Sequence, residues 1–416
     1  LGVLISGFYP AFVLSAFQPA LVLKGKFSAS RGGILLRKGL VIGQFTVTIA
    51  LIIGSFVVYS QLKFLNERDL GMNISQMLIL RPPELTDWDS TFISRENSFL
   101  GDLKQIPNVQ GAAFSGRIPG AELARNFNVR RKERPDDKYT FRRNIISQDY
   151  IPLYGMKIVA GRNLQASDYN ADSKYIQNFL INETAVKLLG FKSPQDALEQ
   201  KLLMGQRECT IVGVVADYHQ KSLRFALEPT ILGPFYGNDC PISVKVDPRN
   251  LATTISAIKQ KYNQFFPGNL FDYFFLDEKF NEQYKNDQLF GKVFSRFAVF
   301  AILVACLGLL GLSLFATIQR TKEIGVRKVL GATVGNIVLI LSKDFIRLVI
   351  ISIVIATPVA WYVMHTWLQD FAFRIQMNWW IFLISGCLAV FVALATISFQ
   401  AIKAAVANPI KALRTE

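Results

Sequence analysis

Residues 317–344 read TIQRTKEIGVRKVLGATVGNIVLILSKD, and this stretch decides the fold because of what flanks it. On either side lies an uncharged apolar run, Phe297 to Ile318 and Leu348 to Gln369, and each run is long enough to cross a bilayer as a helix. Charged side chains are costly inside hydrocarbon. The stretch is therefore predicted to be a loop between two membrane spans.

The charge of this loop predicts the side of the membrane on which it lies. Between Arg320 and Lys343 it carries five Lys or Arg residues and one acidic residue, Glu323. Short loops that are rich in Lys and Arg remain in the cytoplasm. We therefore expect a cytoplasmic loop over 319–345. An alternative reading of the same charge is a basic loop that lies on anionic lipid.

Two short helical pieces are predicted within the loop, and together they would form a positively charged knob. Glu323 and Arg327 have the spacing of an i, i+4 ion pair in the first piece. Gly331 can end that piece in the left-handed conformation, and Thr333 can cap the next. Seven apolar residues recur at steps of three and four, which predicts one apolar helix face: Val326, Val329, Leu330, Val334, Ile337, Val338 and Leu341.

The composition and charge of the whole chain fit a membrane protein. The chain has 416 residues, is 51% hydrophobic and carries a formal net charge of +15, which raises the question of nucleic-acid binding. Residues 19–38, 320–344 and 403–416 together hold 13 Lys or Arg and 3 Asp or Glu, whereas 63–296 holds 31 and 27. Most of the excess lies in short segments that orient membrane helices, so we expect no nucleic-acid partner.

Four full membrane spans are predicted: Gly39 to Leu62, Phe297 to Ile318, Leu348 to Gln369 and Trp379 to Ile402. Residues 1–38 are expected to be the end of an earlier span and a basic cytoplasmic linker, and 39–65 to be the first full transmembrane helix. Residues 7–26 align weakly with 397–416, which predicts an internal duplication of which this chain holds the tail of the first copy. With the linker inside, 66–288 lies outside the cytoplasm.

Residues 66–288 are long enough for a packed domain of two subdomains, and their pattern mixes strands and helices. Strands are expected at 209–217, 242–246 and 271–275, a hairpin at 129–143, and helices at 182–190 and 247–265. A polar helix opening at Asp277 is expected to run without a proline into the span at Phe297. The fold class is thus an α-helical transmembrane bundle with a large α+β extracytoplasmic domain inserted between its first and second full spans.

Cysteine and histidine usage points to no metal site. Cys209 and Cys240 lie in the extracytoplasmic segment, where a disulfide is allowed and remains one of two alternatives. The chain contains two His residues and has no CxxC or HExxH motif. It also has no GxxxxGK[ST] motif, so ATP hydrolysis is expected in another polypeptide or in a further domain.

Several motifs resemble permeases of the MacB and FtsX type, which serve ATP-binding-cassette (ABC) transporters. They are QFTVTIALIIGSFVVYSQLKFLNERDLGMN (44–73), DYIPLYGMKIVAGRNL (149–164), LINETAVKLLGF (180–191), IVGVVADYH (211–219), FLDEKFNEQY (275–284), RTKEIGVRKVLGAT (320–333) and ANPIKALRTE (407–416). There are two departures. Glu199 stands where the family pattern has a glycine, and Asp344 where glutamate is commoner.

The resemblance implies a MacB-like periplasmic domain at 66–288 and an FtsX-like transmembrane domain at 289–416, in a multi-pass protein of the bacterial inner membrane. It also implies a helix that docks on a dimer of ABC ATPase subunits, formed by Glu323, Gly325, Arg327, Lys328, Gly331, Ala332 and Thr333. A periplasmic adaptor or another periplasmic protein is a further partner that it suggests. No cofactor is expected in this chain, because the partner would use the ATP. Cargo suggested by the family includes peptides, toxins, macrolides and lipoproteins.

Three other features each have a functional and a structural interpretation. His219 with Asp217 has the composition of a general-base pair, but no nucleophile stands beside it in the sequence, which favours a loop histidine. The basic cluster of Arg130, Arg131, Lys132 and Arg134 shares its turn with two Asp residues, which favours a solvated hairpin tip. Gln44 and Gln61 are expected to form hydrogen bonds between helices.

The sequence therefore predicts a non-catalytic permease subunit that couples a partner ATPase to movement of a periplasmic domain. The alternative is an FtsX-like membrane regulator of cell-wall or division enzymes that moves no substrate. A membrane enzyme with its site in the outer domain is a third reading, and it requires a cluster of titratable groups in a cleft.

Overall fold

The structure, a computed structural model, describes residues 31–406 except 88, 90, 135, 171–175 and 235–238. The expected tail at 1–30, its alignment with the end of the chain and the motif at 407–416 lie outside the described residues. The chain divides into two compact units. We call the described part of 1–58, 292–365 and 377–416 the helical unit, and that of 59–291 and 366–376 the sheet unit.

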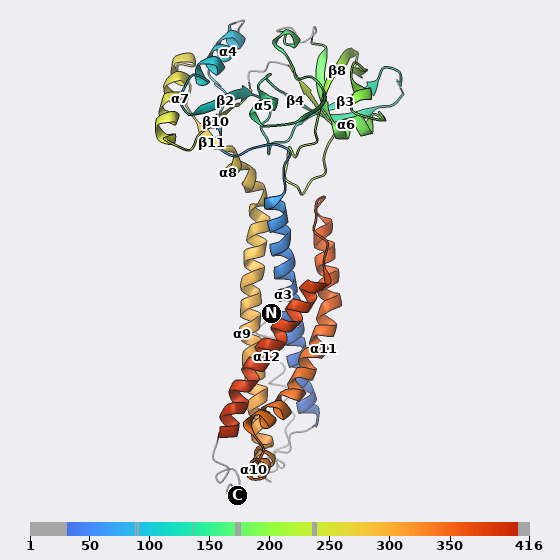
Figure 1. Ribbon diagram of the computed structural model, residues 1–416, viewed down its shortest axis with the longest axis vertical. Coiled ribbons are helices and arrows are strands. Elements are labelled where there is room, and N and C mark those ends of the chain that lie inside the picture. Colours follow the sequence, from blue (N-terminus) through green and yellow to red (C-terminus); the bar gives the residue numbers. More distant parts are fainter. Residues whose placement is uncertain are drawn as a thin grey trace, which may run out of the picture. The chain divides into compact units, whose positions relative to one another are not determined.

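The helical unit is built from the long apolar helices α3 (Arg31–Glu67), α9 (Lys285–Gln319), α11 (Val334–Gln369) and α12 (Trp379–Val406) and the short basic helix α10 (Thr321–Val329) (Figure 1). One end each of α3, α9 and α11 belongs to the sheet unit. Polar side chains join these helices within the unit. The Thr48 hydroxyl donates to the Ala301 carbonyl over 3.3 Å, and the Ser352 hydroxyl donates to the Ile42 carbonyl over 3.0 Å. Such bonds satisfy hydroxyl groups that lipid cannot satisfy.

One expectation for the membrane helices needs correction, and the number of full spans stays a prediction. Residues 31–38, expected as a linker, form the first turns of α3, because they contain no proline and their two glycines do not stop the helix. Three described helices are long and apolar enough to cross a membrane, at Leu35–Glu67, Leu276–Gln319 and Trp379–Lys403. The remaining expected span lies inside α11, which is not among these three, so a total of four full spans stays a prediction.

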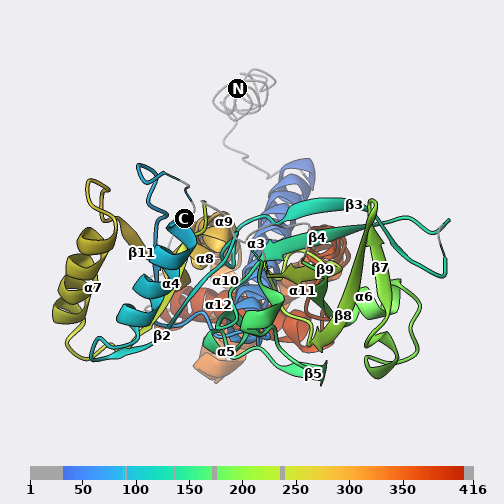
Figure 2. The ribbon, with the colours of Figure 1, turned by 90° about the horizontal axis from the view of Figure 1, so that it is seen from above.

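The sheet unit contains two sheets, as expected for two subdomains. The first is antiparallel, in the order β11-β1-β10-β2, with β1 (Met77–Leu80), β2 (Val109–Phe114), β10 (Ile242–Val246) and β11 (Tyr273–Phe275). Helices α4 (Phe92–Leu103) and α7 (Leu251–Phe265) lie side by side next to this sheet (Figure 2). Their aromatic residues pack onto it, with Phe99 6.0 Å from Tyr262 between ring centroids.

The second sheet is mixed and runs β5-β8-β6-β9-β4-β3-β7. Its strands are β3 (Ala124–Arg131), β4 (Tyr139–Ile145), β5 (Ile158–Gly161), β6 (Asn178–Asn182), β7 (Lys201–Met204), β8 (Arg207–Val215) and β9 (Thr230–Gly233). Strand β7 also pairs with β8, which closes the sheet into a ring. Its core holds Phe179 and Ile211 and packs against α6 (Glu183–Leu188).

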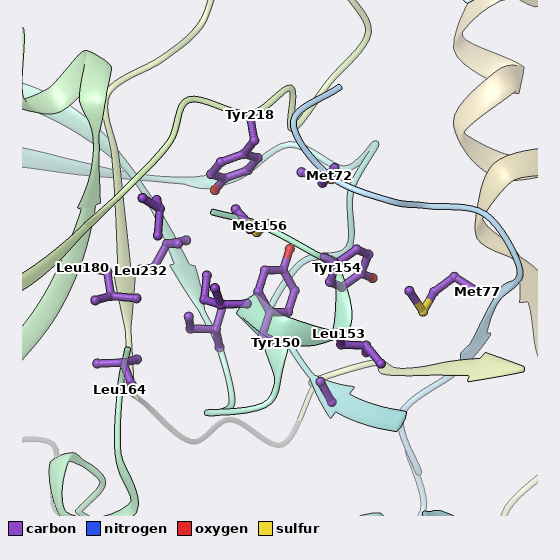
Figure 3. Close-up of a cluster of buried hydrophobic side chains, with 14 of the residues drawn as sticks. Met72, Met77, Tyr150, Leu153, Tyr154, Met156, Leu164, Leu180, Tyr218 and Leu232 are labelled. Carbon is purple, nitrogen blue, oxygen red and sulfur yellow. The ribbon is translucent and has the colours of Figure 1, made fainter. Parts of the chain in front are cut away.

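A central cluster of buried residues joins the two sheets (Figure 3). Tyr150 and Tyr154 of the short helix α5 (Tyr150–Leu153) and the turn after it point into this cluster, between Met77 of β1 and Leu180 of β6. The Tyr154 hydroxyl lies 2.8 Å from the Ser243 hydroxyl of β10, with either group able to donate. Burial of so many apolar side chains holds the two subdomains of this unit together.

Most local predictions for this unit are confirmed. The strands at 209–217 and 242–246, the hairpin at 129–143 and the helix after 247 are all present. Asn182 caps α6 by accepting a hydrogen bond from the Ala185 amide over 3.1 Å, and Gly190 ends the segment with φ +74°. Glu199 has φ +61°, which explains why a glycine is expected at that position.

The disulfide alternative is not realised. Cys209 is buried in the core of the second sheet and Cys240 in the core of the first, and no disulfide joins them. Both residues therefore act as small apolar groups.

The helix expected from Asp277 is present with one local change. It begins at Leu276 rather than Asp277, as α8 (Leu276–Asn281), tightens into a 3-10 turn at Glu282–Tyr284 and continues as α9. The Asp277 side chain accepts a hydrogen bond from the Glu278 amide over 2.8 Å, which suits the start of a helix. The helical path therefore runs from the sheet unit into the longest of the three candidate spans.

Candidate functional site: the coupling elbow and the clamped turn

Two turns, one at the start of α11 and one at its end, are held in place by different kinds of contact. We define the coupling elbow as 320–344, which comprises α10, the turn at 330–333 and the start of α11. We define the clamped turn as 366–376, which follows most of α11 and belongs to the sheet unit.

The coupling elbow has the local geometry that its sequence predicts. Glu323 and Arg327 form an ion pair of 2.7 Å, and Gly331 has φ +89°, a left-handed conformation that ends α10. The Thr333 hydroxyl accepts a weak hydrogen bond of 3.4 Å from the Asn336 amide at the start of α11. The Asp344 carboxylate lies 2.9 Å from the Arg320 guanidinium and ties the two ends of the elbow together.

The single apolar face predicted for the elbow is wrong. Ile337 and Leu341 are buried against Ala401 of α12, whereas Val326 is 50% exposed and Leu330 is 80% exposed. The reason is the turn at 330–333, which rotates α10 relative to α11, so a spacing counted across it does not describe one face. The elbow thus has an anchored side and an exposed apolar side.

The residues assigned to docking are divided between these two sides. Glu323, Gly331 and Thr333 are exposed, Arg327 and Ala332 are half-buried, and Gly325 is buried. Lys328 lies in α10, and its side chain is outside the described part of the chain. The structure brings Glu323 and Arg327 together, and it presents the glycine-containing turn at the tip.

The clamped turn is held by a buried glutamine of α3. Gln61 is fully buried, its Nε2 donates to the Phe373 carbonyl over 2.9 Å, and its Oε1 accepts from the Ile375 amide over 2.9 Å. One side chain therefore satisfies a donor and an acceptor of the turn. The hydrogen bonding expected for Gln61 is confirmed, but its partner is the backbone of a turn and not another helix. Gln44 lies against Gly308 of α9, where an added Cβ would collide with its amide.

The segment around Arg224 holds the turn from another side. The amides of Ala372 and Phe373 donate to the carbonyls of Arg224 and Leu223, over 3.0 and 3.3 Å. The Arg224 guanidinium lies 3.3 Å from the Asp287 carboxylate and 3.8 Å from the Asp370 carboxylate. Phe371 is buried in a cluster with Leu65, Leu223, Phe280 and Tyr284.

Sequence reasoning missed this arrangement. Phe371, Phe373 and Asp370 lie in the short segment between the expected spans at Leu348 to Gln369 and Trp379 to Ile402, for which the sequence predicts no tertiary contact. Gln61 gave the one signal, because an amide at the end of an apolar helix needs a partner. No pattern in the sequence identifies a partner more than three hundred residues away.

His219 and Asp217 do not form a catalytic pair. The Asp217 carboxylate accepts hydrogen bonds from the Thr184 amide and hydroxyl, over 2.8 and 2.9 Å, and from the Asn182 amide nitrogen over 2.9 Å, so it anchors the start of α6. The His219 ring packs edge-to-face on Phe373 of the clamped turn at 4.8 Å. Burial, together with the nearby Arg68 guanidinium, lowers the pKa of His219 against the opposing effect of Asp217. The structure supports the loop-histidine interpretation.

The basic hairpin is also structural. The Arg131 guanidinium stacks on Phe191 at 4.2 Å, and Lys132 forms an ion pair of 2.6 Å with Glu208. Among the described residues, no group of three His, Cys, Asp or Glu side chains is placed to hold a metal ion.

Family comparisons match both units. A family model described as MacB-like periplasmic core domain matches residues 38–260, and one described as FtsX-like permease C-terminal matches residues 296–409.

Two similar proteins come from Pseudomonas syringae and Neisseria gonorrhoeae. A probable syringafactin export ATP-binding/permease protein of Pseudomonas syringae is 24% identical over 46% of this chain and 30% of its own length. The macrolide export ATP-binding/permease protein MacB of Neisseria gonorrhoeae is 24% identical over 50% of this chain and 33% of its own length. The chain spans about a third of the length of these relatives.

Among solved structures, the periplasmic region of MacB from Actinobacillus actinomycetemcomitans matches 52% of this chain and 95% of its own, with 16% identity and a TM-score of 0.35. The extracellular domain of the ABC-type transporter YknZ from Gram-positive bacteria matches 47% of this chain and 97% of its own, with 14% identity and a TM-score of 0.33. The MacB-like family model covers more than half of the chain and the FtsX-like model covers most of the remaining helices. This chain therefore belongs to the MacB/FtsX-type family of ABC transporter permeases.

Proposed function

We propose that this chain is the permease component of an ABC-type export or mechanotransmission complex in a bacterial inner membrane. In this proposal a separate ABC ATPase dimer binds the coupling elbow on the cytoplasmic side, and its ATP-driven closure displaces the elbow. The membrane helices transmit that displacement to the sheet unit in the periplasm. The chain itself hydrolyses nothing and holds no cofactor.

The exposed side of the coupling elbow is the observation that carries this proposal. Leu330 is 80% exposed and Val326 is 50% exposed, beside the exposed carboxylate of Glu323. An apolar tip rimmed by charges is the composition of a protein-binding surface. The opposite side is fixed by Ile337 and Leu341, so a load applied at the tip acts on α11 rather than on a loose loop.

Two features support transmission along the membrane helices. The path from α8 through α9 is helical over Leu276–Gln319 and contains no proline. The clamped turn supplies a second connection, because 366–376 follows α11 in the chain and is bonded within the sheet unit. Displacement of α9 or α11 would therefore reach the sheet unit through backbone and through buried hydrogen bonds.

Handling of cargo outside the bilayer fits the composition of the spans. The windows that define the three candidate spans hold few charged residues, so they offer little to line a polar path through the membrane. The relatives named above are export proteins, one for macrolides and one for syringafactin, which favours export over the regulatory alternative. The class of cargo and a periplasmic adaptor remain parts of the proposal that the relatives suggest.

The test is copurification of the proposed ABC ATPase subunit with the full-length chain in membranes. The Leu330→Glu variant changes the exposed apolar tip and leaves the Glu323–Arg327 ion pair in place. The Arg327→Glu, Lys328→Glu double variant reverses two charges of α10 and breaks that ion pair. We expect either change to weaken ATPase binding at least about tenfold, which corresponds to about 1.4 kcal/mol.

The matched control is Leu270→Glu, because Leu270 is 82% exposed and lies in the sheet unit. Protease resistance of the sheet unit should be the same in all variants. Undiminished copurification of the ATPase with both elbow variants would reject the docking role.

A further inference from the structure

We propose that a groove beside α11 and α12 binds one anionic phospholipid molecule. The groove has a volume of about 450 Å³ and lies wholly within the helical unit. It begins at Gly335, just after the coupling elbow's turn, and α12 contributes Leu394 to its wall. This site is separate from the exposed tip at Leu330 that the proposed function uses.

The wall of the groove suits an acyl chain. Four apolar side chains line it: Val338, Leu339 and Ile346 of α11 and Leu394 of α12. Leu339 is 69% exposed, although it belongs to an apolar helix of a membrane protein. Apolar surface at this level gains free energy when hydrocarbon covers it.

The rim of the groove suits a phosphate group. Lys343 and Arg347 lie one helical turn apart, both are exposed, and no carboxylate pairs with either one in the described part of the chain. The nearby Asp344 carboxylate is already paired with Arg320 at 2.9 Å. The predicted span within α11 begins at Leu348, and such a span would place these two cations where the helix meets the headgroup region.

The side chain of Ser342 gives independent evidence for a polar ligand in the groove. It is 3% exposed and lines the groove, and its hydroxyl has no hydrogen-bond partner among the described residues. Elsewhere in the same bundle, the hydroxyls of Ser352, Thr357 and Ser385 each donate to the carbonyl four residues earlier, over 2.8 to 2.9 Å. A buried hydroxyl without a hydrogen-bond partner costs free energy. A phosphate or ester oxygen of a bound lipid would supply the acceptor that the Ser342 hydroxyl lacks.

These three features together favour an anionic phospholipid over a peptide or a soluble anion. A soluble anion would use the cations but not the apolar wall, and a zwitterionic lipid would use the wall but gain less from the cations. The occupant therefore has one acyl chain against Leu339 and Leu394 and a phosphate between Lys343 and Arg347.

The experiment uses the full chain, purified in a neutral detergent and stripped of lipid. Phosphatidylglycerol or phosphatidylcholine with identical acyl chains is added, and bound lipid is counted by native mass spectrometry while thermal unfolding is followed. We expect phosphatidylglycerol to bind at one molecule per chain with an affinity at least about tenfold above that of phosphatidylcholine.

Three variants locate the site. Lys343→Gln with Arg347→Gln should lower the affinity for phosphatidylglycerol about tenfold and remove the preference between lipids. The control, Lys292→Gln with Arg296→Gln, neutralises an equally exposed pair at the same spacing on α9 and should change neither. Gly335→Leu fills the groove without changing charge, and its new Cβ meets only Thr333 Oγ1 at 4.0 Å, so it should fold and bind both lipids less.

Equal binding of the two lipids would overturn the proposal, as would many weakly bound molecules without saturation, which is the behaviour of a general lipid annulus. Equal losses in the Lys343 and Lys292 double variants would also overturn it. Loss only in the Lys343 double variant and in Gly335→Leu would establish the groove as the site.

Discussion

The turns before and after α11 are built in opposite ways. The clamped turn is bonded by residues far away in the sequence, with Gln61 and Arg224 each bonding to its backbone. The coupling elbow is held by contacts within its own residues and α12, and Leu330 at its tip touches little. A turn with buried long-range bonds is suited to a fixed attachment, and a turn with an exposed apolar tip is suited to receiving a partner. We therefore assign the fixed attachment to the clamped turn and the binding of a partner to the coupling elbow.

The substitution with the largest expected effect removes the bond at the centre of the clamped turn. Gln61→Leu keeps the approximate volume of the side chain but leaves the part-buried Phe373 carbonyl and Ile375 amide without this partner. We expect a loss of about 3 kcal/mol in the free energy of unfolding, seen by thermal unfolding in detergent, with faster hydrogen exchange at 366–376.

Asn66→Leu is the control for this change, because Asn66 is an exposed amide in the last turn of the same helix. It should cost less than about 0.5 kcal/mol. Similar losses in the free energy of unfolding for the two substitutions would mean that the Gln61 hydrogen bonds contribute no more to stability than an exposed amide at the end of the same helix. That result would contradict the proposed difference between the two turns.

The next effect comes from Glu96 of α4, which lies in the first sheet's subdomain. It is 2% exposed, and burial raises the pKa of its carboxyl from 4.5 to about 8. The folded state holds the proton of Glu96 more tightly than the unfolded state does. The contribution of protonated Glu96 to the free energy of unfolding is therefore complete below about pH 4.5 and is lost as the pH rises toward 8. The slope is at most about 1.4 kcal/mol per pH unit.

Glu96→Gln should therefore remove this pH dependence and stabilise the chain by about 2 kcal/mol at pH 8. The clamped turn belongs to the same unit as Glu96, so its exchange with solvent should follow the pH, whereas exchange in the coupling elbow should not. A parallel response of both turns would show that the two units do not unfold separately.

His219 gives a smaller effect of opposite sign at the clamped turn. Burial and Arg68 lower the pKa of His219, so the folded state disfavours the proton. Its contribution to stability is present above the unfolded value of about 6.5 and is lost as the pH falls through the folded value. We expect acidification to loosen 366–376 by less than about 1 kcal/mol, because His219 contacts Phe373.

His219→Phe keeps an aromatic contact and removes the titration. The measurement is made in a chain that also carries Glu96→Gln, which removes the pH dependence of Glu96. The rate of amide hydrogen exchange at 366–376 should then change between pH 6.5 and 5 only as much as the intrinsic chemical exchange rate does. An unchanged acid response in this variant would assign the effect to another group.

The smallest effect on stability is expected at the tip of the coupling elbow. Leu330→Glu should change the free energy of unfolding by less than about 0.5 kcal/mol, since Leu330 is 80% exposed. Thermal unfolding of the purified chain measures this. A large loss would show that the tip is packed rather than available to a partner.

The sequence predicted local structure and the class of fold well, because these depend on neighbouring residues. Periodicity, caps and glycines placed the α6 cap at Asn182, the turn at Gly331 and the long helix near Asp277 close to where they occur. The same reasoning failed where a pattern crossed a break, as in the apolar face of the coupling elbow. It also failed for the clamp at Gln61, because pairing of distant segments depends on tertiary structure, which no local spacing encodes.

Hydrogen exchange at the two turns, in the chain alone and in its complex with the ATPase partner bound to a non-hydrolysable nucleotide, tests the central claim most directly. Our account predicts that amides at 320–336 gain protection in the complex, while amides at 366–376 are protected in both states. Protection gained at the clamped turn with none at the coupling elbow would contradict it.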